Sequence, residues 1–106
     1  MGEEQTTVVI QQYLEELAGG APAEPVVRAL LDRAVRRLHL LGATLLHRCY
    51  PRLARPPWNV KADELLGVVE ERLLKALREA RPRTVREFLA LAGQHTRWEL
   101  NDLARR

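Results

Sequence analysis

Apolar residues recur at helical spacing in four segments of this chain. Within each segment they repeat every three or four residues, and no stretch alternates apolar and polar residues for long enough to predict a strand. The predicted helices cover Thr7 to Ala18, about Glu24 to Tyr50, a third segment that starts between Asn59 and Asp63 and ends near Ala80, and a fourth that follows Thr84. We therefore predict an all-α fold, a compact bundle of about four helices.

Glycines and prolines mark the ends of these helices. Gly19 and Gly20 end the first helix, and the "APAEP" after them is expected to be a linker. Pro51 ends the second helix, and "YPRLARPPWN" predicts a proline-rich crossing in which Trp58 covers the edge of the core. Thr84 and Glu87 form a capping-box pattern, in which each side chain is expected to bind the other residue's backbone N–H.

One apolar stripe on each helix is expected to face the core. The four predicted stripes contain Val8, Ile10, Leu14 and Leu17; Val27, Leu30, Leu31, Ala34, Val35, Leu38, Leu41, Leu45 and Leu46; Leu65, Leu66, Val69, Leu73, Ala76 and Leu77; and Val85, Phe88, Leu89, Ala92, Thr96, Leu100 and Leu103.

The length and composition indicate one domain. A chain of 106 residues, 46% of them hydrophobic, is long enough for one core and short for two. The single cysteine, Cys49, excludes an intramolecular disulfide, and no apolar run reaches the roughly 20 residues that a membrane span needs. We expect a soluble, cytoplasmic protein with no membrane association.

The positive charge is concentrated in the C-terminal half. The chain has 17 basic and 14 acidic residues, and residues 51 to 106 hold 12 of the basic and 8 of the acidic ones. This asymmetry favours an anionic partner near that half, although a modest surplus is also typical of an ordinary solvated surface.

The sequence does not indicate an active site. The three histidines have no metal-ligand spacing, and neither a nucleophile motif nor a phosphate-binding glycine loop is present. We therefore predict no catalytic residues, metal or cofactor, and a protein that is not an enzyme. Cys49 is expected to be a small buried residue rather than a nucleophile.

The outer side of the third helix mixes acidic and apolar residues. Glu64, Gly67, Val68, Glu71 and Leu74 share a face, and this mixture suits a protein partner. Alternatively, Val68 and Leu74 are buried against the first helix, because most apolar helix residues belong to a core.

The fourth helix carries a row of residues suited to nucleic acid. Gln94, Trp98, Asn101 and Arg105 repeat at spacings of three and four, with Arg97 alongside. Amides contact base edges, aromatic rings stack on bases, and arginines neutralise phosphates. Alternatively, Trp98 packs on a neighbouring helix and the others are solvated. A basic cluster in "REARPRTVREF", Arg81, Arg83 and Arg86, favours the nucleic-acid interpretation.

The order of these segments resembles region 2 of bacterial RNA polymerase sigma factors of the extracytoplasmic-function (ECF) type. The resemblance rests on "YPRL", "KADELLGVVEERLLKALRE", "ARPRTVREF" and "LALAGQHTRWELNDLARR", and it covers residues 24 to 106. It divides the chain into an N-terminal helix and linker (1–23) and a sigma region 2-like domain (24–106). The family continues into a helix-turn-helix domain that this chain lacks, so we expect a fragment of a longer protein.

The resemblance implies two binding faces. The acidic helix would dock on the clamp helices of the largest catalytic polymerase subunit through Asp63, Glu64, Gly67, Glu70 and Leu74, where Gly67 replaces a glutamine usual in the family. The next turn and helix would hold the non-template strand of the promoter minus-ten element. The implied DNA-binding residues are Arg81, Arg83, Thr84, Gln94, Arg97, Trp98, Asn101 and Arg105.

Three hypotheses follow for the function. The first is a promoter-recognition domain whose partners are polymerase core, promoter DNA and an anti-sigma factor. The second is a helical adaptor or regulatory dimer without DNA binding, in which Val68, Leu74 and Trp98 form one apolar patch. The third, a small helical enzyme, is the weakest, because the sequence shows no catalytic group.

Overall fold

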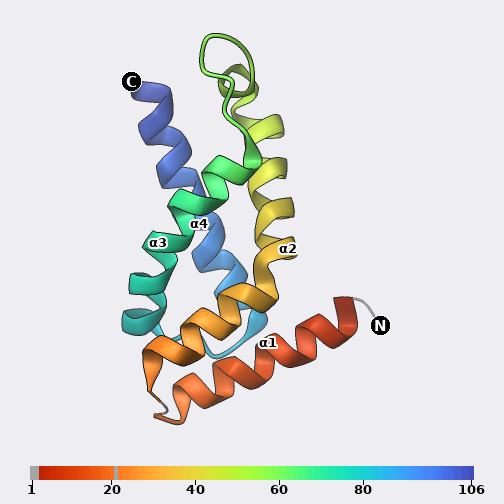
Figure 1. Cartoon of the computed structure of the whole chain (residues 1–106), viewed down its shortest axis with the longest axis vertical. Coiled ribbons are helices and arrows are strands. Elements are labelled where there is room, and N and C mark those ends of the chain that lie inside the picture. The colour runs from red at the N-terminus through yellow and green to blue at the C-terminus, as the bar shows by residue number, and fades with distance from the viewer. Residues whose placement is uncertain (1–2, 21) are drawn as a thin grey trace.

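Four α-helices build the molecule (Figure 1). The computed structural model describes residues 3–20 and 22–106, and these residues contain no strand. The helices are α1 (Glu3–Ala18), α2 (Ala23–Cys49), α3 (Ala62–Ala80) and α4 (Val85–Arg105), with a short 3-10 helix, η1 (Pro51–Ala54), after α2. The prediction of an all-α bundle of about four helices is confirmed.

The helix ends differ slightly from the predicted ones. Helix α1 begins at Glu3 rather than Thr7, because the Glu and Gln residues before the apolar stripe are themselves good helix formers. Gly20 has a φ of 91°, a conformation that glycine adopts without strain, in the turn after α1. The predicted linker is shorter than expected: Ala21 lies outside the described residues, and α2 already begins at Ala23 because the first turn of a helix tolerates Pro25.

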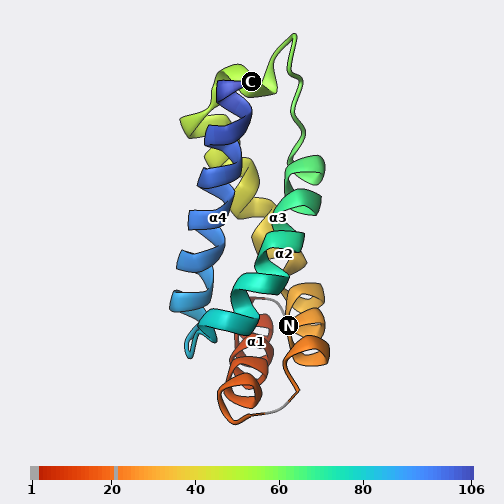
Figure 2. The ribbon, with the colours of Figure 1, turned by 90° about the vertical axis from the view of Figure 1, so that its left-hand side faces the viewer.

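Helix α2 is the central element, in contact with α1, α3, α4 and η1 (Figures 1 and 2). Helices α3 and α4 run antiparallel beside each other, joined by the short turn 81–84. As a result, the end of α4 lies at the same end of the molecule as η1 and the loop before α3.

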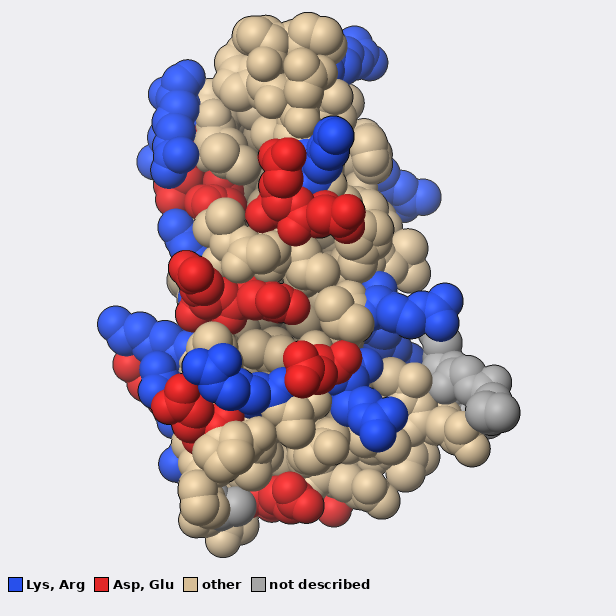
Figure 3. Space-filling view, viewed as in Figure 1, with Lys and Arg blue, Asp and Glu red and all other residues tan. Residues whose placement is uncertain are grey.

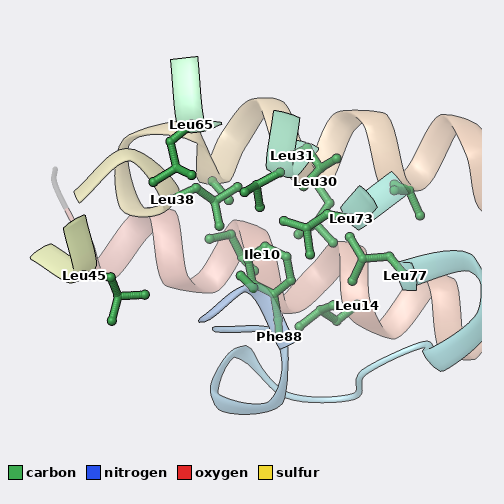
Figure 4. Packing of buried hydrophobic residues seen from close by; sticks show 14 of the residues in the cluster. Ile10, Leu14, Leu30, Leu31, Leu38, Leu45, Leu65, Leu73, Leu77 and Phe88 are labelled. Atoms are coloured by element: carbon green, nitrogen blue, oxygen red, sulfur yellow. The ribbon is translucent and has the colours of Figure 1, made fainter. Parts of the chain in front are cut away.

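One apolar core joins all four helices. Ile10 and Leu14 of α1 meet Leu30 of α2, Leu73 of α3 and Phe88 of α4, and each of these side chains is fully buried (Figure 4). Burying a side chain of this size stabilises a fold by about 1.5–3 kcal/mol relative to leaving it exposed. Because α1 contributes Ile10, Leu14 and Leu17, it is part of the same core as the rest of the chain.

Two predicted core residues are instead exposed. Val8 is 56% exposed because it lies two residues before Ile10, which places it on the opposite side of α1. Val35 is 39% exposed because it sits at the edge of the broad stripe of α2, beyond the reach of its neighbours. The remaining stripe residues are buried or half-buried.

The loop between η1 and α3 is anchored by Leu53 rather than by Trp58. Leu53 is buried, and its carbonyl accepts a hydrogen bond from the Val60 N–H at 2.8 Å. The Asn59 N–H donates to the Arg55 carbonyl at 2.9 Å, and the Pro56–Pro57 peptide bond is cis. Trp58, which was expected to cover the core edge, is 44% exposed, and Leu53 is the buried residue of this segment that belongs to the core cluster.

Candidate nucleic-acid and protein-binding faces

The turn between α3 and α4 uses most of its polar groups to hold the helices. The Thr84 hydroxyl accepts a hydrogen bond from the Glu87 N–H at 3.1 Å, which confirms Thr84 as the N-cap. The Glu87 carboxylate accepts from the Arg83 N–H at 2.8 Å, one residue before the N–H that the capping box predicts. The Arg83 carbonyl in turn accepts from the Gln11 side chain at 2.9 Å, which ties the turn to α1.

Arg81 connects the C-terminal ends of α1 and α3 through hydrogen bonds of its side chain. Its backbone is left-handed, with a φ of 46°, at the C-terminal end of α3. Its guanidinium donates to the Leu17 carbonyl at 2.8 Å and to the Arg78 carbonyl at 3.3 Å. These carbonyls lie at the negative ends of α1 and α3, so the charge of Arg81 stabilises two helix ends. The side chain of Arg83, by contrast, is exposed at the turn.

The predicted row on α4 lies on the outer side of the helix. Gln94, Arg97 and Arg105 are exposed, and Trp98 is 47% exposed. The Trp98 ring is not buried on a neighbouring helix; it meets the His95 ring edge-on, with centroids 4.9 Å apart and planes at 77°. An exposed indole among arginines and an amide is the arrangement that stacks on unpaired bases.

Asn101 is the exception in this row because it already has a partner. The Tyr50 hydroxyl, at the end of α2, donates a short hydrogen bond to the Asn101 side-chain oxygen, and both residues are half-buried. Asn101 therefore joins α2 to α4 as well as bordering the outer face.

Arg72 of α3 lies close to two carboxylates of α4, one of which is buried. Arg72 Nη2 lies 3.2 Å from Asp102 Oδ2 and 3.6 Å from Glu99 Oε1. Glu99 is only 4% exposed, and a buried carboxylate of this kind is tolerated only with a charged partner. Sequence reasoning missed this pair, although Glu99 falls within the inward stripe, three residues after Thr96 and four before Leu103.

His95 lies beside this ion pair and under Trp98. Its Nδ1 is buried and has no hydrogen-bond partner among the described residues. Burial, together with the nearby positive charge of Arg72, lowers the pKa of His95 below the usual 6.5. A neutral imidazole therefore supports the indole of Trp98 at neutral pH.

The acidic face of α3 is open to solvent at its N-terminal end. Asp63, Glu64 and Gly67 are exposed, and a side chain at Gly67 would meet open space. Glu70 is half-buried. Figure 3 shows acidic side chains across the middle of this side of the molecule, with basic side chains toward its edges.

The apolar members of that face differ from each other. Leu74 is half-buried and packs against the core. Val68 is 46% exposed, so the alternative that it is buried against α1 is wrong. An apolar side chain therefore remains on the solvent side of α3, next to the acidic residues.

A groove of about 660 Å³ crosses the outer side of α2 next to this face. Exposed Val35 and Leu40 line it together with Arg33 and Arg36, and Asp63 borders it from α3. His39 also lines the groove, with Nε2 2.9 Å from the Asp63 carboxylate. The His39 side chain is 46% exposed and that of Asp63 is 87% exposed, so this contact contributes little to stability.

The described residues contain neither a candidate metal centre nor a membrane span. Among residues 3–20 and 22–106, no three His, Cys, Asp or Glu side chains converge to hold a metal ion. In the same part of the chain, each helix is too short or too polar to cross a bilayer. Cys49 is exposed rather than buried, contrary to expectation, because it ends α2 on the side away from the core.

Comparisons with known proteins do not identify a family for this chain. The chain matches no protein-family model, no curated protein and no solved structure.

Proposed function

We propose that this chain is a promoter-recognition domain of the sigma region 2 type, a non-enzymatic, cytoplasmic module that binds polymerase core and promoter DNA in transcription initiation. The outer row of α4 would hold the unpaired non-template strand of the minus-ten element, and the acidic face of α3 would dock on the polymerase clamp helices. The observation that carries this proposal is the exposed indole of Trp98, in line with Gln94 and Arg105.

The energetics support a division of labour between the two faces. Stacking on an aromatic side chain contributes about 1–3 kcal/mol per base, which is comparable to the few kcal/mol needed to unstack a base from duplex DNA. One exposed indole therefore cannot open a duplex by itself. The acidic residues Asp63, Glu64 and Glu70 would provide the remaining affinity by holding the domain on the polymerase.

The first test measures DNA binding. Fluorescence anisotropy of a labelled single-stranded minus-ten oligonucleotide, with the chain alone and with polymerase core, should show weak binding that the core strengthens. Trp98→Ala should lower the affinity about 5- to 100-fold, because it removes one stacking contact. Val8→Ala, which alters an exposed residue of α1, is the matched control. Wild-type affinity in Trp98→Ala, or no DNA binding even with the core, would refute the proposal.

The second test measures polymerase binding. Glu64→Lys reverses a charge on the acidic face and should weaken binding to polymerase core, more strongly at low salt than at high salt. Glu16→Lys makes the same change at an exposed site on α1 and should bind normally. Equal affinities for the two variants would remove α3 from the polymerase interface.

A helical adaptor or regulatory dimer is the alternative function. The exposed apolar side chains of Val35, Leu40 and Val68 favour it, because a self-associating helical protein would bury such residues. Light scattering distinguishes the two: a stable dimer that fails to bind DNA supports the adaptor, and a monomer that binds DNA supports the promoter-recognition domain.

A further inference from the structure

A second concave site lies at the end of the molecule where α2, the loop and α4 meet. This pocket has a volume of about 250 Å³, and its lining includes Tyr50, Arg52, Leu53, Trp58 and Ala104. Figures 1 and 2 both show the end of α4 beside η1 and the loop. The pocket therefore adjoins the last turn of α4 and extends the side of the molecule that carries Asn101 and Arg105.

The walls of this pocket are held in place by the fold. Leu53 is 3% exposed and forms the apolar base. The hydrogen bond from the Val60 N–H to the Leu53 carbonyl holds the second half of the loop next to it. Tyr50 is fixed by its hydrogen bond to Asn101. Trp58, in contrast, keeps 44% of its surface in solvent, so a large aromatic side chain remains available to a ligand.

Basic side chains predominate around the pocket. Residues 47–60 contain no Asp or Glu and three exposed arginines, Arg48, Arg52 and Arg55. Arg105 and Arg106, at the end of α4, are exposed as well. The acidic residue of that last turn, Asp102, lies 3.2 Å from Arg72, and the next acidic residues along the chain after residue 60, Asp63 and Glu64, belong to the start of α3. Exposed arginines therefore outnumber acidic side chains at this end of the molecule, and one of them, Arg52, lines the pocket.

From these observations we infer that the pocket receives a nucleobase of single-stranded DNA, which stacks on Trp58 while Arg52 and Arg55 neutralise the flanking phosphates. Pockets for drug-sized ligands measure about 300–1,000 Å³, so this smaller one suits a single planar ring system. Proteins that bind single-stranded nucleic acid combine exposed aromatic rings with nearby cations, as Trp58 and Arg52 are combined here. The inference rests on the proposed function, since it adds a second contact for the strand that α4 would hold.

The two tryptophans allow each site to be observed separately. Because the chain contains only Trp58 and Trp98, Trp98→Phe leaves Trp58 as the sole indole and Trp58→Phe leaves Trp98. Each single-tryptophan protein is titrated with single-stranded DNA, with the same strand made abasic, and with a mononucleotide, and indole fluorescence is recorded. Stacking should quench Trp58 with the intact strand and far less with the abasic strand or the mononucleotide.

Affinity measurements provide an independent readout. Trp58→Ala should lower the affinity for single-stranded DNA about 5- to 100-fold. Arg52→Gln and Arg55→Gln should each reduce the salt dependence of binding by about one counterion, whereas Arg33→Gln, on the outer side of α2, should not. Circular dichroism should show unchanged folding, because Trp58 and all three arginines are exposed.

Three outcomes would overturn the inference, and each is distinguishable from failure of the proposed function. Trp58 fluorescence that stays constant while Trp98 is quenched would remove the pocket and leave the α4 face intact. Equal quenching of Trp58 by a mononucleotide would make the pocket a site for free nucleotides. Protection of Trp58 from acrylamide by a protein partner, with no response to DNA, would make it a protein contact. If neither tryptophan responds and DNA does not bind, the proposed function itself fails.

Discussion

The two sides of the 21-residue helix α4 differ in their burial: one side belongs to the core and the other faces solvent. The inner side includes Phe88, Thr96, Glu99 and Leu100, all of which are buried. The outer side presents Gln94, Arg97 and Trp98 to solvent. Substitutions on the inner side are therefore expected to change the free energy of unfolding, and substitutions on the outer side to change binding with little effect on unfolding.

The largest effect on the free energy of unfolding is expected when the aromatic residue on the inner side of α4 is replaced, compared with the one on the outer side. Phe88→Ala removes the largest fully buried side chain and should lower the free energy of unfolding by about 3–5 kcal/mol, measured by urea denaturation. Trp98→Ala, on the same helix, should lower it clearly less, because Trp98 is 47% exposed and its ring contact is with His95 of the same helix. Similar losses in the two variants would mean that Trp98 belongs to the core.

The next largest effect on stability is expected at the ion pair between Arg72 of α3 and Glu99 of α4. Arg72→Met leaves the buried carboxylate of Glu99 without its partner and should cost about 3 kcal/mol of stability. The double variant Arg72→Met/Glu99→Leu should recover much of that loss, since it removes both charges. Arg28→Met breaks an exposed ion pair with Glu24 and should cost less than about 1 kcal/mol. No recovery in the double variant would show that packing, not charge, determines the effect.

A smaller loss of stability is expected at the N-terminal cap of α4, which supports both sides of the helix. Thr84→Ala removes the N-cap hydrogen bond to the Glu87 N–H and should lower stability by about 0.5–2 kcal/mol in thermal denaturation. Thr44→Ala, at an exposed position inside α2, serves as the control and should be nearly neutral. Loss of DNA binding in Thr84→Ala at a temperature where it is fully folded would give Thr84 a direct contact with DNA, as the resemblance implies.

The smallest expected effect is the pH dependence of folding stability that His95 introduces. Because its pKa is lower in the folded chain than the usual 6.5, unfolding takes up a proton at mildly acidic pH. Its stabilising contribution is complete above pH 6.5 and decreases as the pH falls through 6.5 toward the folded-state pKa. Stability measured at pH 7.5 and 5.5 should decline less in His95→Gln than in the wild type. A wild-type decline in His95→Gln would assign it to other groups.

The sequence predicted the helices well because their signals are local. Apolar spacing, the Gly19–Gly20 pair, Pro51 and the Thr84 cap each act within a few residues, and each is reflected in the structure. Val8 and Val35 were misjudged because apolar character alone does not tell whether a neighbouring helix reaches the residue. The start of α1 at Glu3 shows the same limit, since polar helix formers extend a helix beyond its apolar stripe.

The candidate site was harder to predict because its contacts join distant parts of the chain. The exposed positions of Gln94, Arg97 and Trp98 follow from helical spacing, and they were predicted correctly as an outer row. The partners of Arg81 and Asn101, Leu17 and Tyr50, are 64 and 51 residues away and leave no periodic signal. The pocket around Trp58 depends on how the loop closes over Leu53, which composition does not specify.

The hydrogen bond from Tyr50 to Asn101 has a consequence for cooperativity. Tyr50 lines the pocket, and Asn101 belongs to the row on α4, so one bond is shared by both places. An occupant that moves the phenol would free the amide oxygen of Asn101, and an interaction that recruits this oxygen would release the phenol. Thermodynamic linkage then requires each event to alter the affinity for the other by the same factor. Replacing this single hydroxyl, as in Tyr50→Phe, would uncouple the two.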